Sequence, residues 1–72
     1  MKTFTLESEY IELSQLLKLL GPFQSGGEVK HAIGNGDVFV DGQLELRRKC
    51  KLHIGQHIKY KTTEIKIIGG SK

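Results

Sequence analysis

The sequence predicts an α+β domain in which two short helices pack on a small, mostly antiparallel sheet. Leucines recur near the N-terminus with the period of a helix, whereas apolar residues in the second half alternate with polar ones between Gly-containing turns. A strand, two helices and then several strands in this order are typical of helices packed on one side of a sheet. With 72 residues the chain suffices for one domain with a small core. We expect that domain over residues 1–68, followed by a flexible tail over 69–72.

The first helix is expected to follow a short strand in TFTL and to end at Gly21. Its apolar positions recur at i, i+3, i+4 and i+7, and these are Leu13, Leu16, Leu17 and Leu20. Gly21 ends the helix and Pro22 prevents its continuation. Lys18 lies off the apolar stripe, near the negative end of the helix dipole, where a cation is favoured.

A second, shorter helix is expected in SGGEVKHAIGNG. Ser25 and Glu28 have the spacing of a capping box, in which each side chain satisfies a free backbone N–H. The buried stripe consists of Val29, Ala32 and Ile33. Asn35-Gly36 offers a left-handed exit from the helix. Neither helix is long enough to be stable alone, so both must pack on the sheet.

The rest of the chain reads as strands and turns. Val38 and Val40 alternate with Phe39, and Asp41-Gly42 is a strong hairpin signal. A second turn is expected at Gly55-Gln56. Ile58 and Tyr60 form one face of a later strand, Ile65 and Ile67 one face of the last, and Thr62-Thr63 is the expected connection between these two strands.

Charge and cysteine content limit the class of protein. The net charge is +3, and residues 28–61 hold seven Lys/Arg against four Asp/Glu, which indicates an anionic partner. Cys50 is the only cysteine, so no internal disulfide is possible and a reducing compartment is favoured. The first residues lack the apolar run of a signal peptide, and no apolar stretch is long enough to span a membrane. We therefore expect a cytoplasmic protein with no membrane contact.

The stretch LSQLLKLLGPFQSGGEVKHAIGNGDVFVDG resembles the RNA-binding domain named after small-subunit ribosomal protein S-four, the αL motif. The matching pieces are the apolar helix ending at Gly21, the Ser25-capped helix, GDVFVDG and IGQHIKY. Together they span roughly residues 11–60. Small stand-alone bacterial members of the YbcJ and YaaA type are also similar in SGGE and in the basic run after the turn. The resemblance implies binding of structured RNA and no catalysis.

This chain departs from the family pattern at three positions. The family usually has Arg after the capping Ser, a frequent RNA contact, and Gly26 stands there instead. Val29 replaces a usual Ala. Asp41 replaces a usual Asn, which keeps the turn but adds a negative charge.

The basic run Arg47–Lys51 is the first candidate for phosphate binding. Lys and Arg hold phosphate, and Arg can do so with a bidentate fork. On a strand, Arg47, Lys49 and Lys51 would share one face, but Arg48 would then point toward the core, so the run is either bent at an edge or a loop. The alternative is a solvated basic loop with no ligand.

The start of the second helix is another candidate. Gly26 and Gly27 leave bare N–H groups at the positive end of a helix dipole, where a phosphate can approach closely. Alternatively, Glu28 satisfies those donors itself and repels phosphate. The complete set of candidate RNA contacts is Lys18, Ser25, Gly26, Gly27, Lys30, His31, Arg47, Arg48, Lys49, Lys51 and Lys59.

Other chemistries are less well supported. Cys50, His53 and His57 are metal-ligand types at short spacing, but Cys50 and His53 would point to opposite faces of a strand, so no metal site is expected. No catalytic motif, cofactor or small-molecule substrate is indicated. Phe39 is the one candidate platform for base stacking, so we expect recognition of RNA shape and backbone.

The predicted function is binding of structured RNA, with ribosomal RNA or a ribosome-assembly particle as the partner and a monomer as the binding form. The alternative is a protein-interaction module whose basic face meets an acidic protein. Ribonuclease treatment discriminates the two, because only a protein complex survives it.

Overall fold

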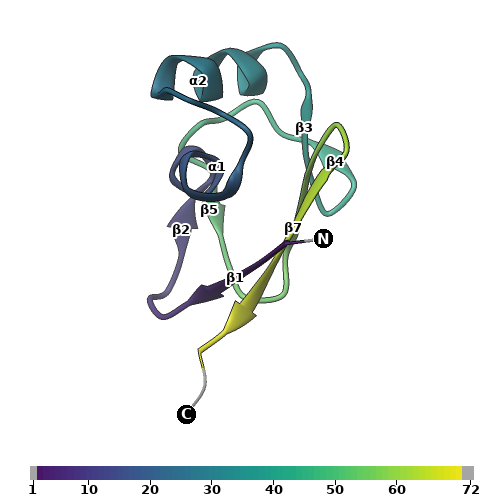
Figure 1. Ribbon diagram of the computed structural model, residues 1–72. Coiled ribbons are helices and arrows are strands. Elements are labelled where there is room, and N and C mark those ends of the chain that lie inside the picture. Colours follow the sequence, from purple (N-terminus) through teal and green to yellow (C-terminus); the bar gives the residue numbers. More distant parts are fainter. Residues whose placement is uncertain (1, 71–72) are drawn as a thin grey trace.

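The computed structural model describes residues 2–70 and has the predicted α+β architecture. Both helices lie on one side of a five-stranded sheet, and a short two-stranded ribbon flanks them (Figure 1). The elements in chain order are β1 (Lys2–Leu6), β2 (Ile11–Glu12), α1 (Leu13–Leu20), α2 (Gly26–Gly34), β3 (Val38–Val40), β4 (Gln43–Leu44), β5 (Lys51–Leu52), β6 (His57–Tyr60) and β7 (Thr63–Gly69).

The sheet has the strand order β1-β7-β6-β3-β4. Only the β1–β7 pair in it is parallel, with Lys2 opposite Ile65 and Leu6 opposite Gly69. The other three pairings are antiparallel, which agrees with the predicted mostly antiparallel sheet. The separate ribbon pairs β2 with β5, so that Ile11 lies opposite Leu52.

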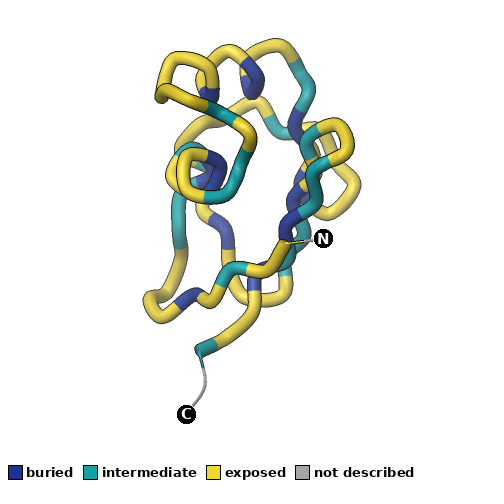
Figure 2. The backbone as a smooth tube through the Cα atoms, in the orientation of Figure 1, coloured by how far each residue is buried: buried dark blue, intermediate teal, exposed yellow. Residues whose placement is uncertain are grey.

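A single core lies between the helices and the inner face of the sheet. Figure 2 shows the buried stretches of the helices and the strands turned toward one another. The predicted helical stripes are buried except for Leu20, and the predicted inward-facing residues of β3, β6 and β7 are buried except for Tyr60; Leu20 and Tyr60 are half-buried. The buried residues are Leu6, Leu13, Leu16, Leu17, Val29, Ala32, Ile33, Val38, Val40, Leu52, Ile58, Ile65 and Ile67.

The hairpin turn after β3 is as predicted, but the turn before β7 is not. Asp41 and Gly42 both have positive φ, 53° and 83°, as a type I′ turn requires. The connection from β6 to β7 is Lys61-Thr62 rather than Thr62-Thr63, because Thr63 is already paired with Tyr60. Lys61 itself takes the left-handed conformation, with φ 53°. Because this turn contains no Gly or Asn, it could not be predicted from the sequence.

The ends of the helices follow the expected pattern with one change. Ser25 Oγ accepts a hydrogen bond from the Glu28 N–H at 3.4 Å, but the Glu28 carboxylate accepts from the N–H of Gln24, not of Ser25. At the end of α1, Lys2 Nζ donates to the carbonyl of Leu20 at 2.6 Å. The Lys2 side chain therefore joins the edge strand to the negative end of this helix.

Strand β7 continues to Gly69, one residue into the segment expected as a tail, and Ser71 and Lys72 lie outside the described residues. Neither helix of the described part of the chain is long and apolar enough to cross a membrane.

Candidate nucleic-acid interface

The cations Arg47, Arg48, Lys49 and Lys51, with Cys50, form a segment that we call the basic loop. Of the two conformations left open above, the structure has the loop, since only Lys51 belongs to a strand. Its backbone is held by α1: the N–H groups of Leu13 and Ser14 donate to the carbonyls of Cys50 and Arg48 at 2.9 and 3.0 Å. The first N–H groups of a helix have no partner within the helix, so they are free to anchor this loop. The basic loop is therefore attached to the start of α1.

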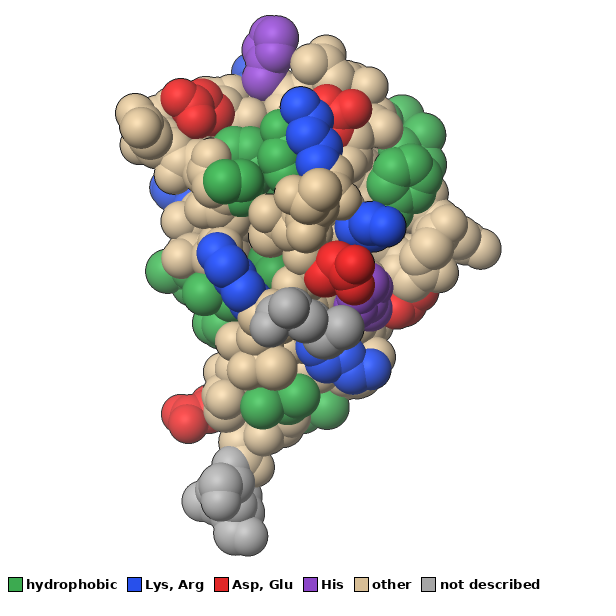
Figure 3. Space-filling view, turned by 45° about the vertical axis from the view of Figure 1, so that its right-hand side comes forward, with side chains coloured by type: hydrophobic (Ala, Val, Ile, Leu, Met, Phe, Trp, Pro, Cys, Tyr) green, Lys and Arg blue, Asp and Glu red, His purple; other side chains and the backbone are tan. Residues whose placement is uncertain are grey.

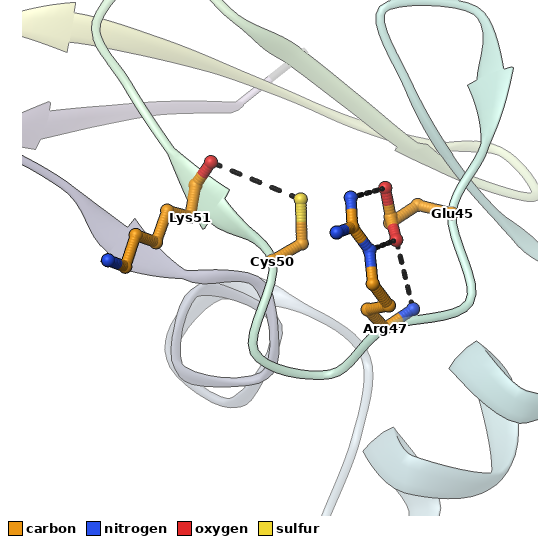
Figure 4. A network of polar contacts seen from close by, with 4 residues as sticks. All are labelled: Glu45, Arg47, Cys50 and Lys51. Atoms are coloured by element: carbon orange, nitrogen blue, oxygen red, sulfur yellow. Dashed lines mark hydrogen bonds and ion pairs between the residues drawn. The ribbon is translucent and has the colours of Figure 1, made fainter.

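One cation of the basic loop is already paired. Arg47 Nε lies 2.9 Å from Glu45 Oε2, Nη2 lies 3.4 Å from Oε1, and the Arg47 backbone N–H donates to the same carboxylate at 3.0 Å (Figure 4). These hydrogen bonds lower the pKa of Glu45 from 4.5 to about 2. Glu45 thus stays charged and offsets Arg47, which leaves Arg48, Lys49 and Lys51 without an ion-pair partner among residues 2–70.

Cys50 lies half-buried within the basic loop, with Sγ 4.0 Å from the carbonyl oxygen of Lys51 (Figure 4). Burial, and secondly the Glu45 carboxylate, raises the pKa of the thiol. A neutral thiol is a poor nucleophile and a poor metal ligand. His53 and His57 are engaged elsewhere, with the carbonyl of Glu9 and the carboxylate of Glu64, and residues 2–70 hold no group of three metal-ligating side chains.

Tyr10 lies beside the basic loop, and the sequence analysis did not identify it. Lys51 Nζ lies 4.9 Å from the centre of the Tyr10 ring, within the range of a cation–π contact. The pairing of β2 with β5 creates this proximity, since Glu12 lies opposite Lys51. No local signal could have revealed it, because the two residues are distant in sequence.

The end of α1 and the start of α2 form a second group of candidates. A Cβ placed on Gly26 would lie 3.9 Å from Lys18 Nζ, so this ammonium lies next to the start of α2. Ser25, Gly27 and His31 line one surface hollow of about 580 Å³. The Glu28 carboxylate also lies at this helix start, where it accepts from the N–H of Gln24, which precedes α2, and not from the N–H groups of Gly26 or Gly27.

The remaining candidates lie elsewhere. Lys30 is exposed on α2, one turn after Gly26. Lys59 lies directly opposite Phe39, on the sheet face that points away from the helices, whereas its neighbours Ile58 and Tyr60 face the core. The fold thus places Lys59 apart from the helical candidates. That the others form a single RNA-binding surface stays a prediction.

Comparison with known proteins agrees with this architecture. The family model of the S4 domain matches residues 4–68, and the chain therefore belongs to the S4 domain family. This confirms the resemblance to the S-four-type αL motif and extends it over nearly the whole described chain.

Particular relatives are small proteins of the same kind. YbcJ of Escherichia coli (strain K12) is 39% identical over 69 residues, which cover 94% of this chain and 99% of YbcJ. The solution structure of YbcJ, described as an αL motif involved in RNA binding, superposes with a TM-score of 0.71 at 38% identity and covers 94% of this chain and 87% of that one. The probable ribosome maturation protein RlbA of Bacillus subtilis is 34% identical over 55 residues, 76% of this chain and 78% of RlbA.

Proposed function

We propose that this protein binds structured RNA, and that it does so as a binding module without catalytic activity. Membership of the S4 domain family and the likeness to YbcJ, whose motif is described as involved in RNA binding, support this. The likeness to a ribosome maturation protein favours ribosomal RNA or a ribosome-assembly particle as the partner. A monomer in the cytoplasm remains the expected form.

The observation that carries the proposal is the anchored basic loop. Arg48 and Lys49 are exposed, have no ion-pair partner among residues 2–70, and lie on a backbone held to α1 at two carbonyls. A loop that is ordered before binding loses little conformational entropy when it meets phosphate. These cations neutralise backbone phosphates, whose contacts position RNA without reading its sequence.

The proposal is tested with a structured ribosomal RNA hairpin and a DNA duplex of equal length, each titrated over a range of salt concentrations. Wild type should bind the RNA more tightly than the DNA. In Arg48→Gln/Lys49→Gln the plot of log binding constant against log salt concentration for RNA should become less steep by about 1.8, since each phosphate contact contributes about 0.9.

The matched control is Lys2→Gln/Lys66→Gln, which removes the same charge from β1 and β7. It should change the slope much less. If both double variants change the slope equally, net charge alone drives binding. If RNA and DNA bind equally weakly and neither variant matters, the proposal fails.

A protein partner is the second candidate, and one observation favours it. Leu46, next to the basic loop, is 55% exposed, which suits an apolar contact beside the cations. In this case a complex captured from cells survives ribonuclease and is lost in Leu46→Gln, whereas an RNA complex is lost on ribonuclease treatment.

A further inference from the structure

The outer face of the sheet carries an aromatic side chain that is partly exposed and lies outside the core. Phe39 lies between the buried Val38 and Val40, so its ring points away from the core, and it is 39% exposed. Both helices lie on the opposite face (Figure 1). A surface position on a strand accepts polar residues readily, so the ring is not needed for the core.

The neighbours of this ring form a row across the sheet. Phe39 lies directly opposite Leu44 on one side and Lys59 on the other, and Lys59 in turn lies opposite Glu64. Directly opposed side chains in antiparallel strands have Cβ atoms about 4.5–5.5 Å apart. Phe39 therefore has an apolar side chain opposite it on one neighbouring strand and a lysine side chain on the other.

The row borders a surface hollow of about 470 Å³, which Asp37, Phe39, Gly42, His57, Lys59 and Lys61 line. A Cβ on Gly42 would meet no atom, so the hairpin turn leaves this side of the hollow open. Glu64, which lies opposite Lys59 on β7, is within 3.0 Å of His57 Nε2. Neither Lys59 nor Lys61 has an ion-pair partner among residues 2–70, and Lys61 Nζ lies 5.4 Å from the centre of the Tyr60 ring.

The space-filling view from the sheet side shows a mixed surface. Lysine and acidic side chains are interleaved there, with hydrophobic side chains between them (Figure 3). Such a face lacks the continuous positive charge that a duplex backbone needs. It offers instead one aromatic platform, with Lys59 directly opposite it and Lys61 in the lining of the same hollow. An aromatic ring with cations nearby is the combination that binds an unpaired nucleotide: the base stacks on the ring and the phosphates meet the lysines.

We propose that the outer face of the sheet is a second nucleic-acid site, at which an unpaired RNA nucleotide stacks on Phe39 while its phosphates contact Lys59 and Lys61. The proposal rests on the proposed function in assigning RNA as the ligand, but it concerns a single-stranded segment and a different face. In this arrangement the basic loop holds the folded part of an RNA, and the sheet holds an adjoining unpaired segment.

The test uses a short oligouridine, which forms no secondary structure. The chain contains no tryptophan, so Phe39→Trp introduces a single fluorophore at the site. Oligouridine should quench its emission, because a stacked base lies against the indole. Phe39→Leu, which keeps an apolar side chain but removes the ring, should weaken oligouridine binding by about fivefold or more, whereas Phe39→Tyr should retain it.

Ile68 provides the matched control, since it is an apolar residue of β7 that is also exposed, at 38%. Ile68→Ala should leave oligouridine binding unchanged. Thermal unfolding of each variant, followed by circular dichroism, ensures that folded proteins are compared. The proposal is overturned if oligouridine does not quench the emission of Phe39→Trp and Phe39→Leu binds oligouridine as tightly as wild type does.

The two proposals fail separately. If Arg48→Gln/Lys49→Gln weakens hairpin binding but no Phe39 variant affects oligouridine, only the sheet site is lost. If oligouridine quenches Phe39→Trp while wild type does not bind the hairpin, only the proposed function is lost. If the emission of Phe39→Trp changes with RNA-free ribosomal proteins but not with oligouridine, this face binds a protein partner, and the proposed nucleotide site on the sheet is wrong.

Discussion

The backbone N–H of Ser14, in the first turn of α1, donates to the carbonyl oxygen of Arg48 at 3.0 Å. The bond links the start of a core helix to the centre of the basic loop. It also occupies a donor that a helix start would otherwise present to an anion. At α1, therefore, the positive end of the helix positions cationic side chains, and the side chains rather than the helix are available to phosphate.

Releasing Arg47 from Glu45 should strengthen RNA binding. In Glu45→Gln the carboxylate charge that offsets Arg47 is removed, so the guanidinium becomes available to a phosphate. We expect the log–log salt slope for the RNA hairpin to steepen by about 0.9, which titrations at several salt concentrations measure. Glu7→Gln raises the net charge equally in the segment between β1 and β2 and serves as the control. A slope equally steep in both variants would point to net charge instead.

Restoring arginine at the family's usual position should also tighten binding. A side chain on Gly26 has room, because its Cβ would meet only Lys18 Nζ at 3.9 Å and Cε at 4.0 Å. Gly26→Arg should steepen the salt slope by about 0.9 if the start of α2 faces the RNA. Gly34→Arg adds the same charge at the other end of the helix, also in open space, and should have a smaller effect. Equal effects would exclude the start of α2 from the interface.

Two glycines in the helical layer should respond to alanine in opposite directions. At Gly21 a Cβ would lie 2.6 Å from the Leu17 carbonyl oxygen and 2.7 Å from the Phe23 ring, although φ of −82° suits any residue. Gly21→Ala should reduce the free energy of unfolding by about 1–3 kcal/mol. Gly34→Ala meets no atom and should raise it by up to about 1 kcal/mol. Urea unfolding measures both, and equal signs would contradict the steric argument.

Acid should remove the stabilisation that Glu45 provides. The hydrogen bonds from Arg47 lower its pKa from 4.5 to about 2, so the folded state favours the carboxylate. This stability is fully present above about pH 4.5 and is lost as the pH falls toward 2. The difference in unfolding free energy between wild type and Glu45→Gln should therefore shrink across this window in urea titrations.

Asp41 does not confound this comparison. Its pKa is also lowered, first by the side-chain hydrogen bond from Gln56 and then by the His57 N–H, but it is present in both proteins. A difference that stays constant down to pH 2 would show that the Glu45–Arg47 pair adds nothing to stability.

Local pattern was sufficient to predict most of the fold. The leucine stripe of α1, the alternation of Val38 and Val40 and the Asp41-Gly42 turn each depend on a few neighbouring residues, and each is found as expected. The connection at Lys61-Thr62 escaped prediction because a lysine adopts the left-handed conformation there without the usual sequence signal.

The candidate site was less accessible to prediction. The cations of the basic loop can be read from the sequence, but the sequence does not show which of them are free to bind phosphate. Whether Glu45 pairs with Arg47 depends on the path of the loop, and the contact of Tyr10 with Lys51 depends on a strand pairing between distant segments. Likewise, Lys59 lies on the same outer face as Phe39 and apart from the other candidates. Predicting this would have required the register of β3 and β6.

The parallel pairing of β1 with β7 has a consequence for how the chain acquires its structure. Among the described residues, β1 is the first strand along the chain and its only neighbour in the sheet is β7, so Phe4 and Leu6 cannot reach their final partners until residues 65–69 are available. Contacts between such distant segments are entropically slow to form. The β3–β4 hairpin joins residues close in sequence and can form early, whereas closure of this sheet edge must await β7.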